Sequence, residues 1–456
     1  MDVSIEARLR TELRMSAEAL TVPDDLPARV ERRIALRRRQ ALSARVAVAA
    51  LGVAAMGVAV VVAGGDDRPT EVLPPAVGSP SEGTWEPLPE APISARFQHA
   101  AAWTGNEMIV FGGYDGGDAG EGGAAAYSPA TGTWRRLAEP PSEVMGAPVA
   151  VWTGTEVVAF GGDHDYARHG AIYDPQGDKW RTVSEAPFGT VSSSGSHAVW
   201  TGEQVLVVGF FRQDEDEADG AQGAALYDPA TAEWTQLPDA PDVLPYFRDA
   251  VWTGDELVFI GAEAGNGARA PQRLVALALN PATATWRPLP APPQDVRGEM
   301  LVAWTGKEIV VGGGRAFPDT GTSGTYRDAA AYDPVTNTWR AVPDAPVAFQ
   351  GNERYTDVAV DGQVIAFDTA DPDRRVLVLD PTSGAWRFAP GSNRPELTDS
   401  QELRGRREAP AVSTSDGVLI WGGGVATAEL GGSWRCCRAV GEGALFTPPV
   451  AVAQRE

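Results

Sequence analysis

The chain has 456 residues, of which 43% are hydrophobic, and a formal net charge of −23. The ordinary hydrophobic fraction argues against extended disorder, and the negative charge argues against nucleic acid as the main partner, because it would repel a phosphate backbone. With two cysteines and four histidines, neither a disulfide framework nor a metal centre is expected, and we expect no cofactor. The 51 glycines and 36 prolines favour many turns and few long helices.

The N-terminal segment, residues 1–45, is expected to lie in the cytoplasm and to form two short helices. These cover roughly residues 5–20 and 28–42 and are separated by a breaker that contains Pro23 and Pro27. The second helix is basic and amphipathic, which suits the headgroup region of a membrane. A docking helix for a cytoplasmic regulator, such as a sigma factor, is the alternative.

An apolar run without a charged residue follows, from Val46 to Ala63. As a helix it would reach about 27 Å, enough to cross the hydrocarbon core of a bilayer. Arginines precede it, while Asp66 and Asp67 follow it, so the positive-inside rule places the N-terminus in the cytoplasm. We therefore expect a single-pass helix over 46–64 in the cell membrane, with the rest of the chain extracytoplasmic. A cleaved signal peptide is the alternative.

Beyond a linker expected at residues 65–80, tryptophans reveal a repeat with spacings of 46 to 54 residues. The repeating residues are Trp85, Trp134, Trp180, Trp234, Trp286, Trp339 and Trp386. Six of them end a turn of one design, as in YSPATGTW and YDPVTNTW. Five units also contain an apolar strand that ends in Trp-Thr-Gly, at Trp103, Trp152, Trp200, Trp252 and Trp304. Each unit is therefore expected to hold four short strands.

These units resemble the Kelch repeat of β-propellers, from Thr84 to Pro449. The hallmarks of that family are a glycine doublet that closes the second strand, a Tyr-Asp turn after the third and a Trp that opens the fourth. In the fifth unit they stand as Gly312-Gly313, Tyr332-Asp333 and Trp339. The third, fourth and sixth units lack the doublet. The resemblance implies an all-β, seven-bladed Kelch-like propeller over 81–449, followed by a tail at 450–456. The Arg-rich, Lys-poor composition suggests a bacterial source.

The chain ends predict how the ring closes. The first Trp strand, which begins at Trp85, has no partner strands before it. The last unit, residues 409–449, has three strands and no Trp strand after them. Joining the two gives seven full blades, and closure of this kind removes exposed sheet edges.

Alternate turns of a four-stranded blade lie on opposite faces of a propeller. The Trp-Thr-Gly and DPxTxxW turns share one face, here called the turn face, and are nearly identical between blades. The second-to-third loops and the inter-blade connections share the other face, here called the loop face. They vary widely, as at residues 113–123, 212–223, 315–328, 391–408 and 424–443. Because variable loops on a rigid scaffold usually carry binding, we expect ligands at the loop face.

Arginines gather just before the innermost strands: Arg96, Arg248, Arg297, Arg354 and Arg407. They would present guanidinium groups to a carboxylate or a similar anionic group at the central funnel. His99 and neighbouring aromatic residues would stack on a sugar ring. The prediction is a binding module for an unknown protein or an anionic glycan. The alternative is that these arginines only tie adjacent blades together through salt bridges.

Enzymatic activity is not expected. A copper oxidase of the galactose oxidase type needs a Tyr–Cys crosslink, a second Tyr and two His, and the positions of Cys and His here do not supply them. The alternative function is that of a cofactor-free carbohydrate enzyme, such as a sugar-acid mutarotase. It would use Glu299, Glu353 or Glu408 in acid–base chemistry. The acidic loops match no complete EF-hand loop, so no metal site is predicted.

Cys436 and Cys437 are adjacent in one late loop. Outside the membrane they would form a vicinal disulfide that rigidifies this loop, or pair with another chain. A free, buried pair is the alternative.

Overall fold

The computed structural model describes the chain from residue 83 to residue 449. The gaps within this range are residues 116–122, 145, 162–167, 188–195, 211–221, 242–245, 265–270, 317–323, 351–357, 370–375, 390–405, 408 and 427–436. The chain divides into two compact units, Met1–Ala76 and Val77–Glu456, and every described residue belongs to the second. The predicted cytoplasmic segment, membrane helix, linker and tail lie outside the described residues. Among those described, no helix is long and apolar enough to cross a membrane.

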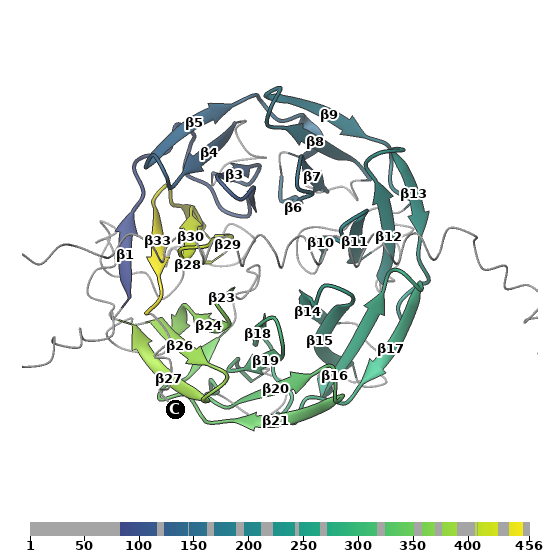
Figure 1. Ribbon diagram of the computed structural model, residues 1–456, viewed down its shortest axis with the longest axis vertical. Coiled ribbons are helices and arrows are strands. Elements are labelled where there is room, and N and C mark those ends of the chain that lie inside the picture. Colours follow the sequence, from purple (N-terminus) through teal and green to yellow (C-terminus); the bar gives the residue numbers. More distant parts are fainter. Residues whose placement is uncertain are drawn as a thin grey trace, which may run out of the picture. The chain divides into compact units, whose positions relative to one another are not determined.

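Seven four-stranded antiparallel sheets form blades around a common axis (Figure 1). In six blades the strands follow one another outward in chain order, so the first strand lies innermost and the fourth forms the outer wall. The predicted all-β, seven-bladed propeller is therefore confirmed. The helical structure among the described residues is one short 3-10 turn, η1 (Ser142–Val144).

The first three blades follow one another along the chain. Blade one comprises β2 (Ala100–Trp103), β3 (Met108–Phe111), β4 (Ala124–Ser128) and β5 (Thr133–Leu137). Blade two comprises β6 (Val149–Trp152), β7 (Val157–Phe160), β8 (Gly170–Asp174) and β9 (Lys179–Val183). Blade three comprises β10 (His197–Trp200), β11 (Val205–Phe210), β12 (Gln222–Asp228) and β13 (Glu233–Gln236).

The next three blades repeat this order. Blade four comprises β14 (Tyr246–Trp252), β15 (Leu257–Ala264), β16 (Pro271–Asn280) and β17 (Thr285–Leu289). Blade five comprises β18 (Leu301–Trp304), β19 (Ile309–Gly312), β20 (Ala329–Asp333) and β21 (Thr338–Val342). Blade six comprises β23 (Val358–Val360), β24 (Gln363–Ala366), β26 (Val376–Asp380) and β27 (Ala385–Ala389), and β22 (Phe349–Gln350) pairs with β25 (Asp368–Thr369) beside it.

Blade seven combines both ends of the propeller. It comprises β29 (Ala411–Ser413), β30 (Val418–Trp421), β33 (Gly443–Thr447) and, as outer strand, β1 (Thr84–Pro87). Trp85 of β1 pairs with Phe446 of β33, which confirms the predicted closure. Short strands β28 (Arg406–Arg407), β31 (Gly424–Ala426) and β32 (Cys437–Ala439) form a small sheet next to this blade.

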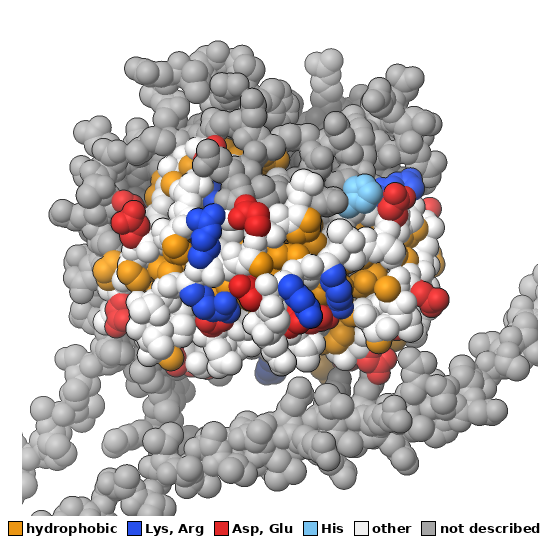
Figure 2. All heavy atoms as spheres, turned by 90° about the horizontal axis from the view of Figure 1, so that it is seen from above, with side chains coloured by type: hydrophobic (Ala, Val, Ile, Leu, Met, Phe, Trp, Pro, Cys, Tyr) orange, Lys and Arg blue, Asp and Glu red, His pale blue; other side chains and the backbone are white. Residues whose placement is uncertain are grey.

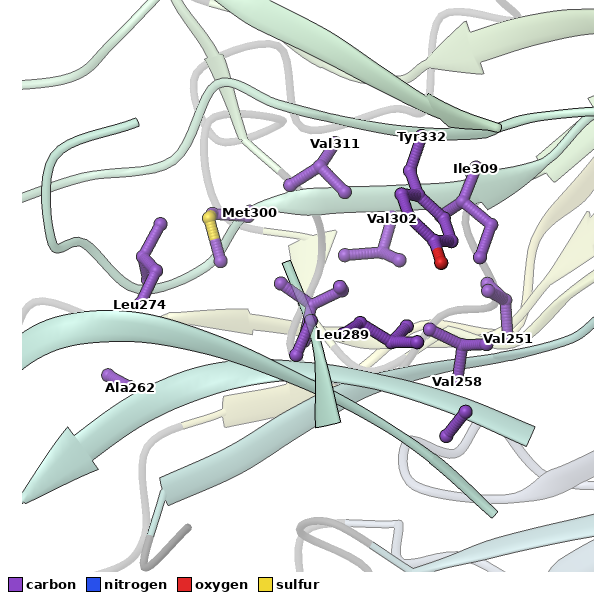
Figure 3. Packing of buried hydrophobic residues seen from close by; sticks show 13 residues of the cluster. Val251, Val258, Ala262, Leu274, Leu289, Met300, Val302, Ile309, Val311 and Tyr332 are labelled. Carbon is purple, nitrogen blue, oxygen red and sulfur yellow. The ribbon is translucent and has the colours of Figure 1, made fainter. Parts of the chain in front are cut away.

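The core lies between the blades. Each sheet packs against a neighbour on both faces, so second strands such as β3 are buried along their whole length. Figure 3 shows one such interface, where Val258 and Leu289 of blade four meet Val302 and Tyr332 of blade five. The outer strands are buried mainly at one end, as in β5, where Leu137 is buried and its neighbours are exposed.

The glycine doublets make room for the chain as it enters the next blade. The Gly113 N–H donates to the Gly146 carbonyl oxygen at 2.5 Å, and a Cβ on Gly112 would lie 2.9 Å from the Val144 carbonyl oxygen. Both glycines have a positive φ, +68° and +90°. Blade four lacks the doublet, and there β15 runs on without interruption to Ala264.

In blade five the doublet was predicted one residue too early. Leu301 pairs with Gly312 just as Ala100 of blade one pairs with Phe111. Gly312 is therefore the last residue of β19, and the turn is made by Gly313 and Gly314, with φ of +62° and +89°. Three consecutive glycines look alike in a sequence, and only the strand pairing distinguishes them.

The outer tryptophans link neighbouring blades. The indole N–H of each donates to a carbonyl in the connection that leaves the preceding blade, at 2.7 to 3.0 Å. The donors are Trp134, Trp180, Trp234, Trp286, Trp339 and Trp386. Their rings also pack against the neighbouring blade, as Trp180 does edge-on against Phe111. The tryptophans whose spacing revealed the repeat therefore connect neighbouring blades.

Candidate functional site

Two of the predicted ligand-binding arginines, Arg96 and Arg297, are buried at the loop face of blades one and five. Arg96 is 2% exposed, and its guanidinium donates to the carbonyl oxygens of Gly112 and Gly123 at 3.0 and 3.1 Å. Arg297 is 3% exposed and donates to the equivalent carbonyl oxygen, that of Gly313, at 3.3 Å. Each arginine therefore ties the segment before its innermost strand to the glycines that end the second strand.

The loop of blade five adds two further contacts to Arg297. Its Nη1 atom lies 2.6 Å from Oδ1 of Asp328, and its guanidinium carbon lies 3.6 Å from the centre of the Tyr326 ring. A buried guanidinium with these partners fixes the described end of the loop, residues 324–328. This geometry matches the alternative that the arginines have a structural role. Arg297, however, joins parts of one blade and does not tie two adjacent blades together.

Strand pairing shows which arginines occupy equivalent positions. The pairs beside them are Phe97 with Tyr114, Gly298 with Arg315, and Arg407 with Gly424. The residue before each pair is Arg96 in blade one, Arg297 in blade five and Arg406 in blade seven. In blade seven the position equivalent to Arg96 is therefore held by Arg406 and not by Arg407, which was predicted. The side chain of Arg248 in β14, that of Arg407 in β28 and the whole of Arg354 lie outside the described residues.

The backbone of Arg96 takes part in ring closure. Its carbonyl oxygen accepts the N–H of Gly423 in blade seven at 2.7 Å, while its side chain bonds blade one. His99 lies at the same joint. It is 5% exposed, and its ring meets that of Trp421 edge-on with centroids 5.2 Å apart. His99 is thus packed between blades one and seven.

Several other predictions fall on residues that are not described. Cys437 opens β32, but its side chain and all of Cys436 lie outside the described residues, so the disulfide stays a prediction. Glu353 and Glu408 also lie outside. In the part of the chain that the structure covers, no group of three His, Cys, Asp or Glu is placed to hold a metal ion.

Exposed charges of blade five form a group that sequence reasoning did not single out, here called the blade-five rim. It consists of two ion pairs at the loop face, Arg315 with Glu299 at 2.5 Å and Arg327 with Asp344 at 3.4 Å. The Arg315 and Arg327 side chains are 49% and 60% exposed. Glu299 has a positive φ of +54°, two residues after the buried Arg297. The buried arginine and its loop therefore position the exposed charges.

The turn face carries a second set of ion pairs that sequence reasoning also missed. In four blades the Glu that follows the Trp-Thr-Gly turn binds the Arg next to the outer Trp. The pairs are Glu107 with Arg135, Glu156 with Arg181, Glu256 with Arg287, and Glu308 with Arg340, at 2.6 to 2.9 Å. The bond from Arg340 holds the pKa of Glu308 below its usual range. Figure 2, an edge-on view, shows basic and acidic side chains next to each other on the outer wall. The repeated WTGxE and WR patterns are the sequence signal from which these ion pairs could have been predicted.

Acid should weaken the joint between blades three and four through His197. Its Nε2 atom is buried without a hydrogen-bond partner, and its ring stands edge-on against Phe259. Burial lowers the pKa of His197 to about 4, whereas the unfolded value is about 6.5. The unfolded chain therefore binds the extra proton first, so stability is full above pH 6.5 and falls as the pH drops toward 4. We expect a loss of about 2 kcal/mol at pH 5.

Chemical denaturation at pH 7 and pH 5 measures this loss. His197→Phe removes the titrating group and should flatten the difference between the two pH values. His169→Gln is the matched control, because His169 is exposed, and it should leave the difference unchanged. An unaltered pH difference in His197→Phe would contradict the assignment.

Comparison with known proteins supports the repeat type. A Kelch motif matches residues 95–141, which contain the buried Arg96, the Gly112-Gly113 doublet and Trp134. The propeller is of the Kelch-repeat type. A family described as a protein of unknown function, DUF1668, matches residues 186–359. The Kelch-like protein terF of Aspergillus terreus is 27% identical over 187 residues, which are 40% of this chain and 39% of that protein. The chain thus spans about two fifths of the length of the curated relative it matches. Kelch-type propellers generally serve as protein-interaction modules.

Proposed function

We propose that this Kelch-type propeller is a protein-binding module that meets its partner with the loop face. The blade-five rim carries the proposal. It presents the half-exposed side chains of Arg315 and Arg327, each with an acidic partner. Both lie close in the chain to Gly313 and Asp328, which the buried Arg297 bonds. Charges fixed in this way favour a complementary protein surface, because little side-chain entropy is lost on binding. The Kelch motif and the Kelch-like relative support the same class of function.

We further propose that the chain displays the propeller outside the cell, through the helix expected over 46–64. The apolar run with arginines before it and aspartates after it supports this placement. An acidic propeller suits such a position, since it avoids the anionic surface of the membrane.

Catalysis has less support than binding. Glu299 is the one candidate acid–base residue that the structure describes, and Arg315 holds its carboxylate in an ion pair. This ion pair gives Glu299 a structural role, which is to hold the exposed side chain of Arg315.

Photo-crosslinking in intact cells tests the proposed face. A benzophenone amino acid at position 327 should yield a covalent adduct with a partner protein. The same residue at position 182, exposed on outer strand β9, should yield none. Prior biotinylation with a reagent that cannot cross the membrane restricts the assay to outward-facing protein. Adducts at 182 alone would contradict the proposed face, and an unbiotinylated propeller would contradict the proposed placement.

A glycan array with purified full-length protein tests the other ligand class. Saturable glycan binding that Arg315→Glu abolishes would replace the protein partner with a glycan at the same rim. Under our proposal no glycan binds there.

A further inference from the structure

The innermost strands of five consecutive blades end in a tryptophan at the turn face. These residues are Trp103 of β2, Trp152 of β6, Trp200 of β10, Trp252 of β14 and Trp304 of β18. All five are half-buried. At the equivalent positions, blade six holds Ala359, which pairs with Val364, and blade seven holds Ser413, which pairs with Val418. The innermost strands lie around the propeller axis (Figure 1). The five tryptophans, here called the indole rim, therefore follow one another around this axis from blade one to blade five.

The indole rim differs from the outer tryptophans in its hydrogen bonding. Each outer indole whose bond is described donates to a carbonyl of the neighbouring blade. Within the described residues, the N–H groups of the indole rim find no acceptor, and none of these nitrogens is shut off from solvent. The rings themselves are supported from behind. Trp304 packs against the core between blades four and five, and Trp152 against that between blades one and two.

Two sets of polar groups next to the indole rim are already engaged. The Thr104 hydroxyl that follows Trp103 donates to the Glu107 carbonyl oxygen at 3.1 Å, and Thr153, Thr201, Thr253 and Thr305 repeat this bond. The carboxylates of four blades are bound to arginines, as Glu156 is to Arg181. These threonines and glutamates therefore offer a ligand little, whereas the five tryptophans offer aromatic surface and N–H donors.

We propose that the indole rim binds a proline-rich segment of a partner protein in an extended, polyproline II conformation. Proline complements this surface because it has a carbonyl acceptor, no N–H donor and an apolar ring that packs on aromatic faces. A polyproline II chain exposes its carbonyls along its length and is ordered before it binds.

Two other ligand classes fit the surface less well. A glycan needs acceptors for its hydroxyl groups, and the nearby threonines and glutamates are engaged. A cationic peptide needs available carboxylates beside the aromatic rings, and Glu107, Glu156, Glu256 and Glu308 are bound to arginines. Stacking without these polar partners leaves buried groups unpaired, which costs binding free energy.

Fluorescence anisotropy of a fluorescein-labelled decaproline peptide, titrated with full-length protein, tests the proposal. We expect saturable binding that a Gly-Ser peptide of equal length does not show. Trp152→Phe with Trp200→Phe removes two donors and keeps an aromatic ring at each place. Two lost hydrogen bonds should weaken decaproline binding about tenfold. Trp252→Phe with Trp304→Phe repeats the test in other blades.

Trp180→Phe is the matched control, because its indole N–H bonds the Ala138 carbonyl between blades. It should lower the melting temperature and leave decaproline binding unchanged. No binding of decaproline, or double variants that both bind it as tightly as the unchanged protein does, would overturn the proposal. Binding of maltohexaose in place of decaproline would reassign the indole rim to glycans. The blade-five rim lies on the opposite face, so Arg315→Glu separates a failure here from a failure of the proposed function.

Discussion

Deleting residues 81–92 is expected to lower the free energy of unfolding by more than about 5 kcal/mol. The deletion removes β1, which pairs with β33 along four residues. It also removes Trp85, whose ring contacts Phe446 and Phe367 with centroids 4.8 and 5.9 Å away. The loss of such an aromatic side chain alone costs about 3–5 kcal/mol. The deletion further exposes β33 as an unpaired edge, which invites aggregation.

Thermal unfolding followed by circular dichroism measures this effect. Trp85→Ala should show most of the loss, while Glu86→Ala, on the same strand and exposed, should change stability by no more than about 0.5 kcal/mol. A deletion variant that melts like the intact chain would mean that the ring does not depend on β1 for closure.

Replacing Arg297 by Met should destabilise the protein by about 1–3 kcal/mol, because a buried acceptor is left without a donor. The substitution keeps much of the side-chain volume and removes the guanidinium that bonds Gly313 and Asp328. The buried carbonyl oxygen would then lose its donor, and the Tyr326 ring would lose its cation. Chemical denaturation of the full chain measures the change.

Arg327→Met is the matched control in the same blade. Its ion pair with Asp344 is exposed at both partners, 60% and 53%, so its removal should cost no more than about 1 kcal/mol. The pair of variants separates the two interpretations of the arginines. If Arg297→Met kept full stability and lost the crosslink at position 327, Arg297 would be a ligand-binding residue and not a structural one.

Opposite faces of the propeller offer different chemistry. The loop face presents the ion-paired charges of the blade-five rim, near the buried Arg297. The turn face presents tryptophan rings beside glutamates that are bound to arginines. A ring of rigid blades can hold two such surfaces at once, because each blade contributes a turn to one face and a loop to the other. Two partners with different chemistry would therefore not compete.

The roles of the arginines show where sequence reasoning stopped. The sequence showed Arg96 and Arg297 just before innermost strands, and this position was correct. Their partners, the carbonyl oxygens of Gly112 and Gly313, lie 16 residues away in each case. A hydrogen bond between such residues exists only once the second strand has folded back on the first, so the sequence could not distinguish a buried anchor from a ligand contact.

The tryptophans show the same division. Their spacing and the turn residues between them determined the four-stranded unit, the number of blades and the closing strand, because turns and strand patterns are local properties of the chain. Only the tertiary structure decided which indoles are joints and which stay open to solvent. Trp180 bonds the preceding blade, whereas Trp152 in the same blade ends at the turn face without an acceptor among the described residues. That difference depends on what a neighbouring blade places next to each ring, and it arises only when the propeller closes.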